Sequence, residues 1–168
     1  MDLKIQALNK SHEKRNFECG YSLLDNYIKT QAKQDVSRDL SACFVLGDEN
    51  NNVIGYYTLS ANSIDRDDFP DDMSRKLPPS YQDLPTILLG RLAIDNTYKG
   101  NGYGEFLLFD ALKRCVEISD SLGSLAVVVD LIDEKAGTFY GRYGFILLPG
   151  SKKMFIPLKT IRELFLAN

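Results

Sequence analysis

Residues 87–122 combine an aliphatic run, a glycine-rich turn and an amphipathic run, and this combination constrains the fold most strongly. Residues 87–94 are mostly aliphatic and lie between a proline and an Asp-Asn pair, which predicts a buried strand. Beyond the turn, apolar positions recur at steps of three and four residues, which predicts a helix; they are Leu107, Leu108, Ala111, Leu112, Cys115, Val116, Ile118 and Leu122. A strand, a glycine turn and a helix in this order direct several backbone N–H groups and the positive end of the helix dipole to one point. A phosphate would bind there.

The spacing of the glycines in residues 99–104, KGNGYG, separates this turn from two common nucleotide-binding motifs. A Walker A loop needs GxxxxGK[ST], and no Lys-Ser or Lys-Thr pair follows these glycines. A dinucleotide fingerprint needs GxGxxG, whereas the glycines here follow the pattern GxGxG. Turns of this kind also occur as simple helix starts, so the turn alone leaves both a phosphate site and a structural role open.

Length and composition indicate a globular protein with one domain over residues 1–168. Hydrophobic residues make up 44% of the chain and charged residues 26%, which is ordinary for a chain with its own core. The formal net charge of −3 excludes a polycation, so a nucleic-acid partner would require a local basic patch. The three cysteines have no CxxC spacing and fit reduced thiols in the cytoplasm. No apolar run approaches the roughly 20 residues of a membrane helix, so we expect no membrane partner.

Predicted strands and helices alternate along the rest of the chain. Apolar runs predict further strands at residues 3–8, 42–46, 53–61, 125–130, 145–148 and 154–157. Apolar stripes predict helices at residues 22–36, 133–142 and 158–166, with Ser22 and Asp133 as N-caps. The sum is an α/β fold with a mixed sheet of six or seven strands flanked by helices. The polar residues 62–86 form either a substrate lid or a mere connector, with one short helix near residues 71–75.

A second motif lies in the segment DLIDEKAGTFYGRYGF, where Ala136, Phe139, Tyr140, Gly144 and Phe145 follow the pattern AxxFYxxxGF. This pattern resembles the signature that closes the cofactor site of GNAT N-acetyltransferases. The earlier turn, Lys99-x-x-Gly102-x-Gly104, resembles the pyrophosphate loop of the same family, [RQ]xxGx[GA], with a lysine in place of the usual Arg or Gln. The two motifs occur in the order found in the family. The resemblance implies a single-domain GNAT-type fold whose mostly antiparallel sheet is splayed at the cofactor site.

Three further segments, FECGYSLLDNYIKTQAKQD, GYYTLSANSI and LPTILLGRLAID, extend the resemblance over most of the chain. They are similar to the GNAT subgroup whose members are toxins of toxin–antitoxin pairs. The resemblance implies that acetyl-CoA is the acetyl donor and that the acceptor is the free amine of aminoacyl-tRNA, whose acetylation blocks translation. It also implies a ribbon-helix-helix antitoxin as partner and a homodimer.

The resemblance also assigns roles to individual residues. Tyr140 is the catalytic candidate, because its hydroxyl would lie near the thioester sulfur and could donate a hydrogen bond or a proton to the leaving thiolate. The alternative is that Tyr140 is one more core aromatic beside Phe139. Backbone groups at the end of the strand would bind the pantetheine arm, and the turn would bind the diphosphate. The full set of expected cofactor-binding residues is Leu92, Ala93, Ile94, Lys99, Gly100, Asn101, Gly102, Tyr103, Gly104 and Phe139.

The chain offers few candidates for a general base. The only histidine, His12, lies in a polar N-terminal stretch, where we expect it at the solvated surface, and residues 87–94 contain no Glu. A lysine amine with a pKa of about 10.4 needs a strong base, whereas an α-amine with a pKa of about 7.7–8.0 is already partly neutral at pH 7. The sequence therefore favours an α-amino acceptor. Arg91, inside the aliphatic strand, is either a snorkelling or ion-paired side chain or a contact to phosphate or substrate.

Two other functions stay open on the sequence. The chain could be a GNAT enzyme that acetylates a small-molecule amine or a protein N-terminus, which the negative net charge favours. It could also be a non-catalytic GNAT fold that binds acyl-CoA or a protein partner. We expect no metal site, because the acidic cluster at residues 65–72 has no recognisable ligand pattern.

Overall fold

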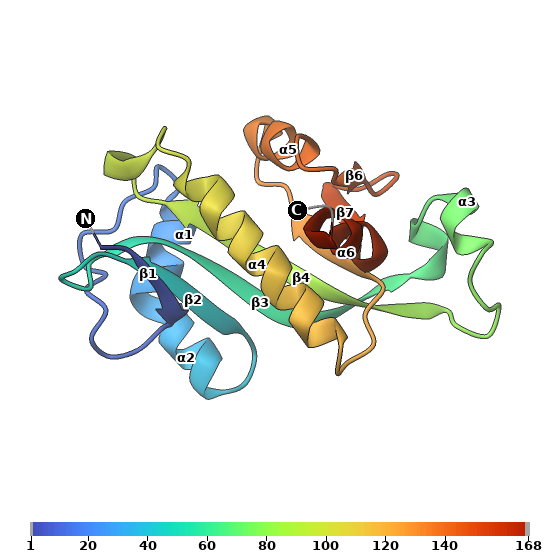
Figure 1. The fold of residues 1–168 in the computed structure, drawn as a ribbon, viewed down its shortest axis with the longest axis horizontal. Coiled ribbons are helices and arrows are strands. Elements are labelled where there is room, and N and C mark those ends of the chain that lie inside the picture. The colour runs from blue at the N-terminus through green and yellow to red at the C-terminus, as the bar shows by residue number, and fades with distance from the viewer. Residues whose placement is uncertain (1, 167–168) are drawn as a thin grey trace. The chain divides into compact units, whose positions relative to one another are not determined.

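A seven-stranded sheet with the order β1-β2-β3-β4-β5-β7-β6 is the main element of the computed structural model, which describes residues 2–166 (Figure 1). Its strands are β1 (Lys4–Ala7), β2 (Ala42–Gly47), β3 (Val53–Asp65), β4 (Asp83–Ile94), β5 (Ala126–Asp130), β6 (Ile146–Leu147) and β7 (Lys153–Pro157). The pairs β1–β2, β2–β3, β5–β7 and β6–β7 are antiparallel, whereas β4 and β5 are parallel. The predicted mixed, mostly antiparallel sheet is therefore confirmed.

The strand β4 begins earlier than predicted, at Asp83, so that Pro85 lies inside it. Proline has no N–H group to donate to a sheet. Its carbonyl is free to accept, and that of Pro85 accepts a hydrogen bond from the Leu125 N–H at 2.8 Å. The register of β4 with β5 then runs from Thr86 to Leu89. Residues 92–94, which we expect to bind pantetheine, come after the residues of β4 that pair with β5.

The helices and helical turns are α1 (Ser22–Asn26), the π-helix η1 (Tyr27–Gln31), α2 (Ala32–Ser37), η2 (Arg66–Asp68), α3 (Asp71–Ser74), η3 (Asn96–Tyr98), α4 (Tyr103–Ser119), α5 (Glu134–Gly141) and α6 (Leu158–Leu166). The longest, α4, has 17 residues, and no helix within residues 2–166 is long and apolar enough to cross a membrane.

The helix predicted at residues 22–36 consists of α1, the π-helical η1 and α2 in succession. The prediction of Ser22 as its N-cap was wrong. Tyr21 holds the N-cap position, and the Asp25 carboxylate accepts a hydrogen bond from the Cys19 N–H at 2.8 Å instead. The cap predicted for α5 is confirmed, because the Asp133 carboxylate accepts from the Ala136 N–H at 2.8 Å.

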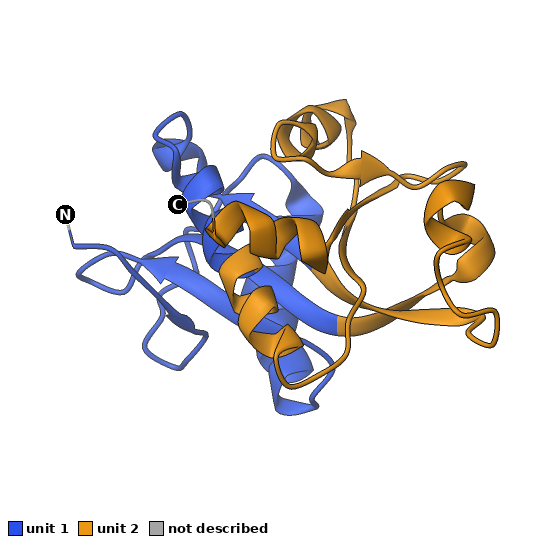
Figure 2. Cartoon of the chain, turned by 45° about the vertical axis from the view of Figure 1, so that its right-hand side comes forward, with its two compact units in different colours: residues 1–60, 90–111 blue, residues 61–89, 112–168 orange. Residues whose placement is uncertain are grey.

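The chain forms two compact units (Figure 2). Unit 1 contains residues 1–60 and 90–111, and unit 2 contains residues 61–89 and 112–168. The elements β3, β4 and α4 each contribute residues to both units. Each unit has its own buried cluster, which includes Phe17, Ile28 and Tyr56 in unit 1 and Phe69 and Phe155 in unit 2. That residues 1–168 act as one domain stays a prediction.

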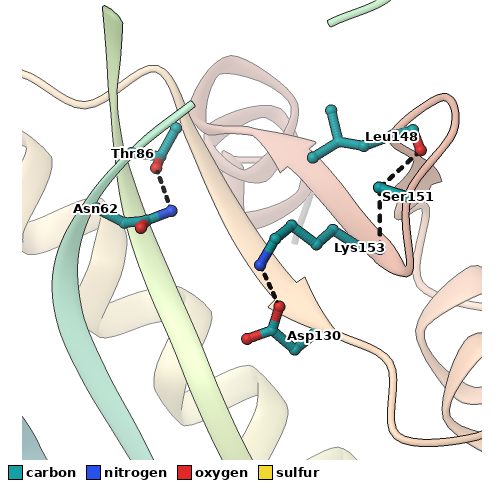
Figure 3. A network of polar contacts seen from close by, with 6 residues as sticks. All are labelled: Asn62, Thr86, Asp130, Leu148, Ser151 and Lys153. Atoms are coloured by element: carbon teal, nitrogen blue, oxygen red, sulfur yellow. Dashed lines mark hydrogen bonds and ion pairs between the residues drawn. The ribbon is translucent and has the colours of Figure 1, made fainter. Parts of the chain in front are cut away.

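Polar contacts in unit 2 hold the connection between β3 and β4. Between the strands that flank it, the Asn62 amide on β3 donates to the Thr86 hydroxyl on β4 at 3.2 Å (Figure 3). The Arg66 guanidinium donates to backbone carbonyls further along, namely those of Ser74 at 3.0 Å, Tyr81 at 2.8 Å, Leu77 at 3.5 Å and Pro78. The connection spans residues 66–82, because both strands are longer than predicted. One arginine binds four of its carbonyls, which favours the connector over the lid.

Candidate active site

The loop that follows β4 in unit 1 is anchored by Asp95. One oxygen of this carboxylate accepts from the Thr97 N–H at 2.9 Å and caps η3. The other accepts from the Glu18 N–H at 3.0 Å, while the Asn96 N–H donates to the Glu18 carbonyl at 2.8 Å. A loop from the N-terminal part of unit 1 is therefore fastened to the start of the glycine turn.

The glycine turn itself presents free amides. Gly100 and Gly102 both have a φ of +82°, a left-handed conformation that glycine adopts at little cost. Within residues 2–166, no backbone N–H of residues 100–104 donates a hydrogen bond. The first helical bond of α4 here is from the Phe106 N–H to the Gly102 carbonyl, at 3.0 Å. Unpaired amides at the positive end of a 17-residue helix fit an anion such as a diphosphate.

The Lys99 ammonium lies against the N-terminal loop rather than free in solvent. Its Nζ donates to the Cys19 carbonyl and lies 5.8 Å from the centre of the Tyr21 ring. An ammonium has three donors, so this bond leaves capacity for an anion. Lys99 therefore has a structural contact in addition to the cofactor contact that the sequence predicts.

Gly55 on β3 allows β4 and α4 to approach closely in unit 1. A Cβ atom at this position would lie 2.6 Å from Ile94 Cδ1, 2.7 Å from the Ala93 carbonyl oxygen and 2.9 Å from Leu107 Cδ1. Such distances are far below van der Waals contact. The close approach positions the backbone of Ala93 and Ile94, two of the residues expected to bind pantetheine.

Arg91 on β4 stacks on an aromatic ring, which the sequence did not reveal. Its Cζ lies 3.5 Å from the centre of the Tyr27 ring, and the Tyr27 hydroxyl donates to the Asp35 carboxylate at 2.9 Å. Burial and the bond to Asp35 raise the pKa of Tyr27 to about 12, although the Arg91 charge acts in the opposite direction. Within residues 2–166, the guanidinium N–H groups of Arg91 have no hydrogen-bond partner or ion pair. Its donors are available to a ligand.

Tyr140 lies on α5 in unit 2, inside an aromatic cluster. Its ring centre is 5.2 Å from that of Phe139 and 5.1 Å from that of Phe145, and its exposed fraction is 7%. The hydroxyl has no hydrogen-bond partner among residues 2–166, yet no buried polar side-chain atom there lacks one. The ring is therefore buried, while the hydroxyl oxygen keeps at least a small contact with solvent.

The protonation of Tyr140 follows from this environment. Burial raises the pKa of its phenol, and the negative charge of Asp130 adds to the increase. The Asp130 carboxylate is itself paired with the Lys153 ammonium (Figure 3). Tyr140 is protonated at neutral pH and is a hydrogen-bond donor, not a base.

The prediction that His12 is solvated was wrong. It is buried at 7% exposure, and its Nδ1 accepts a hydrogen bond from the Asn9 N–H at 3.1 Å. Burial lowers its pKa. The sequence gives no signal for this, because the polar residues around His12 fold into a turn that only the structure reveals. The helix-face prediction for Cys115 is confirmed: it is buried, and burial raises its pKa to about 12.

Metal ligands are not gathered anywhere in the described part of the chain. Within residues 2–166, no group of three or more His, Cys, Asp or Glu side chains could hold a metal ion. All three cysteines are free thiols. The chemistry available to the predicted site residues is thus that of backbone amides, a phenol, a guanidinium and the Lys99 ammonium.

The sequence of the chain matches a known protein family and curated relatives. The model of the Acetyltransferase (GNAT) family matches residues 6–145. The chain is 33% identical over 162 residues to the probable toxin TacT of Sinorhizobium fredii, which covers 91% of this chain and 89% of that protein. It is 33% identical over 144 residues to the tRNA-acetylating toxin of Mycobacterium tuberculosis, which covers 86% and 84%.

Several solved structures have a fold similar to that of this chain over nearly its whole length. A tyrosine-to-phenylalanine mutant of KacT has a TM-score of 0.92 at 32% identity, covering 98% of this chain and 100% of that one. AtaT complexed with acetyl-methionyl-tRNAfMet has a TM-score of 0.89 at 30% identity, covering 98% and 99%. A mutant AtaT toxin bound to the C-terminus of the antitoxin AtaR and acetyl-CoA has a TM-score of 0.80 at 26% identity, covering 98% and 99%.

Sequence, fold and local geometry agree with one another. The glycine turn lies between β4 and α4 with its amides unpaired, and the second motif folds into a capped helix that carries a protonated tyrosine. The family match extends from residue 6 to residue 145 and includes both motifs. The chain belongs to the acetyltransferase (GNAT) family.

Proposed function

We propose that the chain is an acetyl-CoA-dependent N-acetyltransferase of the toxin type, which acetylates the α-amine of aminoacyl-tRNA and thereby blocks translation. The observation that carries this proposal is the unpaired amide turn at residues 100–104, in a chain that is 33% identical to a tRNA-acetylating toxin. The similar toxin AtaT is known in complex with acetyl-methionyl-tRNAfMet and with acetyl-CoA.

The cofactor-binding residues act through their backbones. The amides of Gly100, Asn101, Gly102, Tyr103 and Gly104 bind the diphosphate of acetyl-CoA, with the Lys99 charge beside them. The backbone of residues 92–94 binds the pantetheine arm, and Phe139 contributes apolar contact. The free amides and the left-handed glycines support this assignment, because a side chain at either glycine would strain the turn.

Tyr140 stabilises the leaving group. In acetyl transfer the neutral acceptor amine forms a C–N bond to the acetyl carbon, the C–S bond breaks, and the electron pair stays on the thiolate. The nitrogen, cationic after the attack, releases one proton to water to give the amide. The Tyr140 hydroxyl donates a hydrogen bond to that thiolate. Its raised pKa makes full proton transfer to the thiolate, whose conjugate thiol has a pKa of about 8.5, more unfavourable than for a free phenol. Hydrogen-bond stabilisation is therefore its main contribution.

The acceptor is an amine that needs little help to lose its proton. β4 carries no Glu or Asp between Leu84 and Ile94, and His12 is buried and bonded to its own turn. An α-amine with a pKa of about 7.7–8.0 is partly neutral at pH 7, so it can react without a strong base. Arg91, stacked on Tyr27 with its N–H groups unpaired, binds a phosphate or another anionic part of the substrate.

The proposal extends to location and partners. An enzyme with this substrate acts in the cytoplasm, where aminoacyl-tRNA is used. The similar AtaT toxin binds the C-terminus of an antitoxin, which supports an antitoxin for this chain as well. We assign it to the ribbon-helix-helix class and propose that the chain is a homodimer. An adjacent gene for a small ribbon-helix-helix protein would support the first assignment.

The test compares four acceptor amines and, in a second step, removes the hydroxyl oxygen of Tyr140. Purified protein with acetyl-CoA is offered aminoacyl-tRNA, a lysine peptide, a peptide with a free N-terminus and a small amine. We expect acetylation of aminoacyl-tRNA, and a kcat about 10–100-fold lower for Tyr140→Phe, because a hydrogen bond to a charged group is lost. Tyr143→Phe, which removes a hydroxyl from the same motif, is the matched control and should retain activity.

The outcomes separate the candidate functions. A preference for a small amine or a protein N-terminus would favour the second enzyme reading, which the net charge of −3 supports. Coenzyme A binding without turnover of any amine would favour the non-catalytic fold. A preference for the lysine peptide would contradict the argument about the missing base.

A further inference from the structure

A pocket in unit 1 concentrates positive charge in an otherwise acidic chain. Its volume is about 360 Å³, and its lining includes Lys10, Lys14 and Lys33 but no Asp or Glu. The formal net charge of the whole chain is −3. None of residues 91–104 lines this pocket, so neither the amide turn nor Arg91 is part of its wall.

The three lysines have no anionic partner in the protein. Within residues 2–166, none of their ammonium groups makes an ion pair or a hydrogen bond. The nearest carboxylates in the sequence are engaged elsewhere. Glu13 accepts from the Arg15 N–H at 3.0 Å, and Asp35 accepts from a tyrosine hydroxyl at 2.9 Å. An anionic ligand would therefore be the counter-charge for this cluster.

The wall of the pocket formed by residues 8–14 is held in place by hydrogen bonds. The Leu8 N–H donates to the Cys43 carbonyl at 3.0 Å, and the Glu13 N–H donates to the Asn51 carbonyl at 2.8 Å. Between them, the Asn9 N–H donates to His12 Nδ1 at 3.1 Å, and the Gln6 side-chain amide lies 3.3 Å from His12 Nε2. Burial lowers the pKa of His12, which is thus a neutral support of the turn. The site is formed before any ligand arrives.

The rest of the lining comes from α2, where Lys33, Val36 and Ser37 lie on one face at steps of three and four residues. Val36 and Leu8 pack against the buried cluster of unit 1 and give the pocket an apolar floor. A duplex RNA backbone would leave such a floor unused. The volume lies within the range of small-molecule sites, about 300–1,000 Å³.

From this combination we propose that the pocket binds a small molecule that carries a phosphate group on a compact apolar body. The phosphate lies between the ammonium groups of Lys10, Lys14 and Lys33, because lysine is a point-charge donor suited to phosphate. The apolar part rests on Leu8 and Val36. This site is independent of acetyl transfer and of the choice of acceptor.

The test uses phenyl phosphate and inorganic phosphate as probes, titrated by calorimetry into the full chain saturated with coenzyme A. Coenzyme A occupies the amide turn, so that the probes cannot bind there. We expect one saturable site and tighter binding of phenyl phosphate than of inorganic phosphate. Lys10→Met and Lys33→Met should each weaken phenyl phosphate binding about tenfold, because each removes one charged hydrogen bond. Lys159→Met, an exposed lysine on α6, is the control and should bind like the wild type.

Three results would overturn the proposal. The first is the absence of saturable binding of either probe at millimolar concentration. The second is an unchanged affinity in both Lys10→Met and Lys33→Met. The third is a loss of tRNA binding in these variants while the unmodified protein ignores phenyl phosphate, which would make the cluster an RNA contact. Equal melting temperatures of all variants would show that folding is not the cause.

Discussion

The face of the Tyr27 ring supports the Arg91 guanidinium. The sequence predicts a functional role for Arg91 but gives none to Tyr27, which holds Arg91 in place. The guanidinium lies 3.5 Å from the ring centre, and a contact of this kind at a partly buried site contributes about 1–2 kcal/mol. We expect Tyr27→Leu to raise the KM for aminoacyl-tRNA about tenfold or more while kcat stays near the wild-type value. Tyr27→Phe keeps the ring and should have a smaller effect.

Steady-state kinetics with each substrate varied in turn would measure this difference. The KM for acetyl-CoA is the internal control, because the amide turn does not depend on Tyr27. If Tyr27→Leu left the KM for aminoacyl-tRNA unchanged, Arg91 would not bind the substrate through this arrangement. If both KM values rose together, the loss of the ring would have disturbed unit 1 as a whole.

The junction of β3, β4 and α4 depends on the absence of one side chain. A Cβ at Gly55 would lie 2.7 Å from the Ala93 carbonyl oxygen, and that backbone atom cannot move without displacing β4. We expect Gly55→Ala to destabilise the protein by about 1–3 kcal/mol, the usual effect of overpacking, and to raise the KM for acetyl-CoA. Thermal unfolding and kinetics measure the two effects.

Gly123→Ala is the matched control for Gly55→Ala. Gly123 lies between α4 and β5, and nothing lies within 4 Å of a Cβ built there. It should leave both the melting temperature and the KM for acetyl-CoA near the wild-type values. A Gly55→Ala variant with wild-type stability would mean that the junction is loose, and the close approach of β3 and β4 would then not position the pantetheine segment.

Regular elements were predictable because their periodicity is local. The stripe at residues 158–166 and the aliphatic run before Asp130 fold as predicted into α6 and β5. The π-helical turn η1 was not predictable, since it interrupts a helix without a change in apolar spacing. The amide turn follows from its glycines, whereas the contact of Arg91 with Tyr27 and the burial of His12 depend on partners that the fold alone brings together.

Several buried cysteines and tyrosines keep their protons to a higher pH in the folded protein than in the unfolded chain. This difference determines how the stability of the whole molecule changes at alkaline pH. Burial raises the pKa of Cys19 to about 11, that of Cys43 and Cys115 to about 12, and that of Tyr27 to about 12; it also raises those of Tyr56 and Tyr140. In the unfolded chain, thiols titrate near pH 8.5 and phenols near pH 10. Above these values the folded state binds more protons than the unfolded state, so stability decreases as pH rises.

We therefore expect full stability below about pH 8 and a progressive loss between about pH 9 and 12, with Tyr27 alone contributing roughly 2 kcal/mol by the upper end. Urea unfolding in a reductant at several pH values would measure the free energy of unfolding. Tyr27→Phe should flatten the loss, whereas Tyr81→Phe, at an exposed position, should not. A free energy of unfolding that stays constant up to pH 11 would contradict this account.

The hydrogen-bond donors at residues 100–104 are backbone N–H groups and not side chains, and this has an evolutionary consequence. Substituting Tyr103 removes no peptide N–H, so the proposed recognition of coenzyme A can persist when that residue changes. Asn101 is less free to vary, because its side-chain amide donates to the carbonyls of Tyr98 at 3.0 Å and Lys99 at 3.3 Å and so braces the turn. Only Gly100 and Gly102, whose φ of +82° resists other residues, are tied to one amino acid. Variation among descendants of this chain should therefore accumulate around those two glycines and spare them.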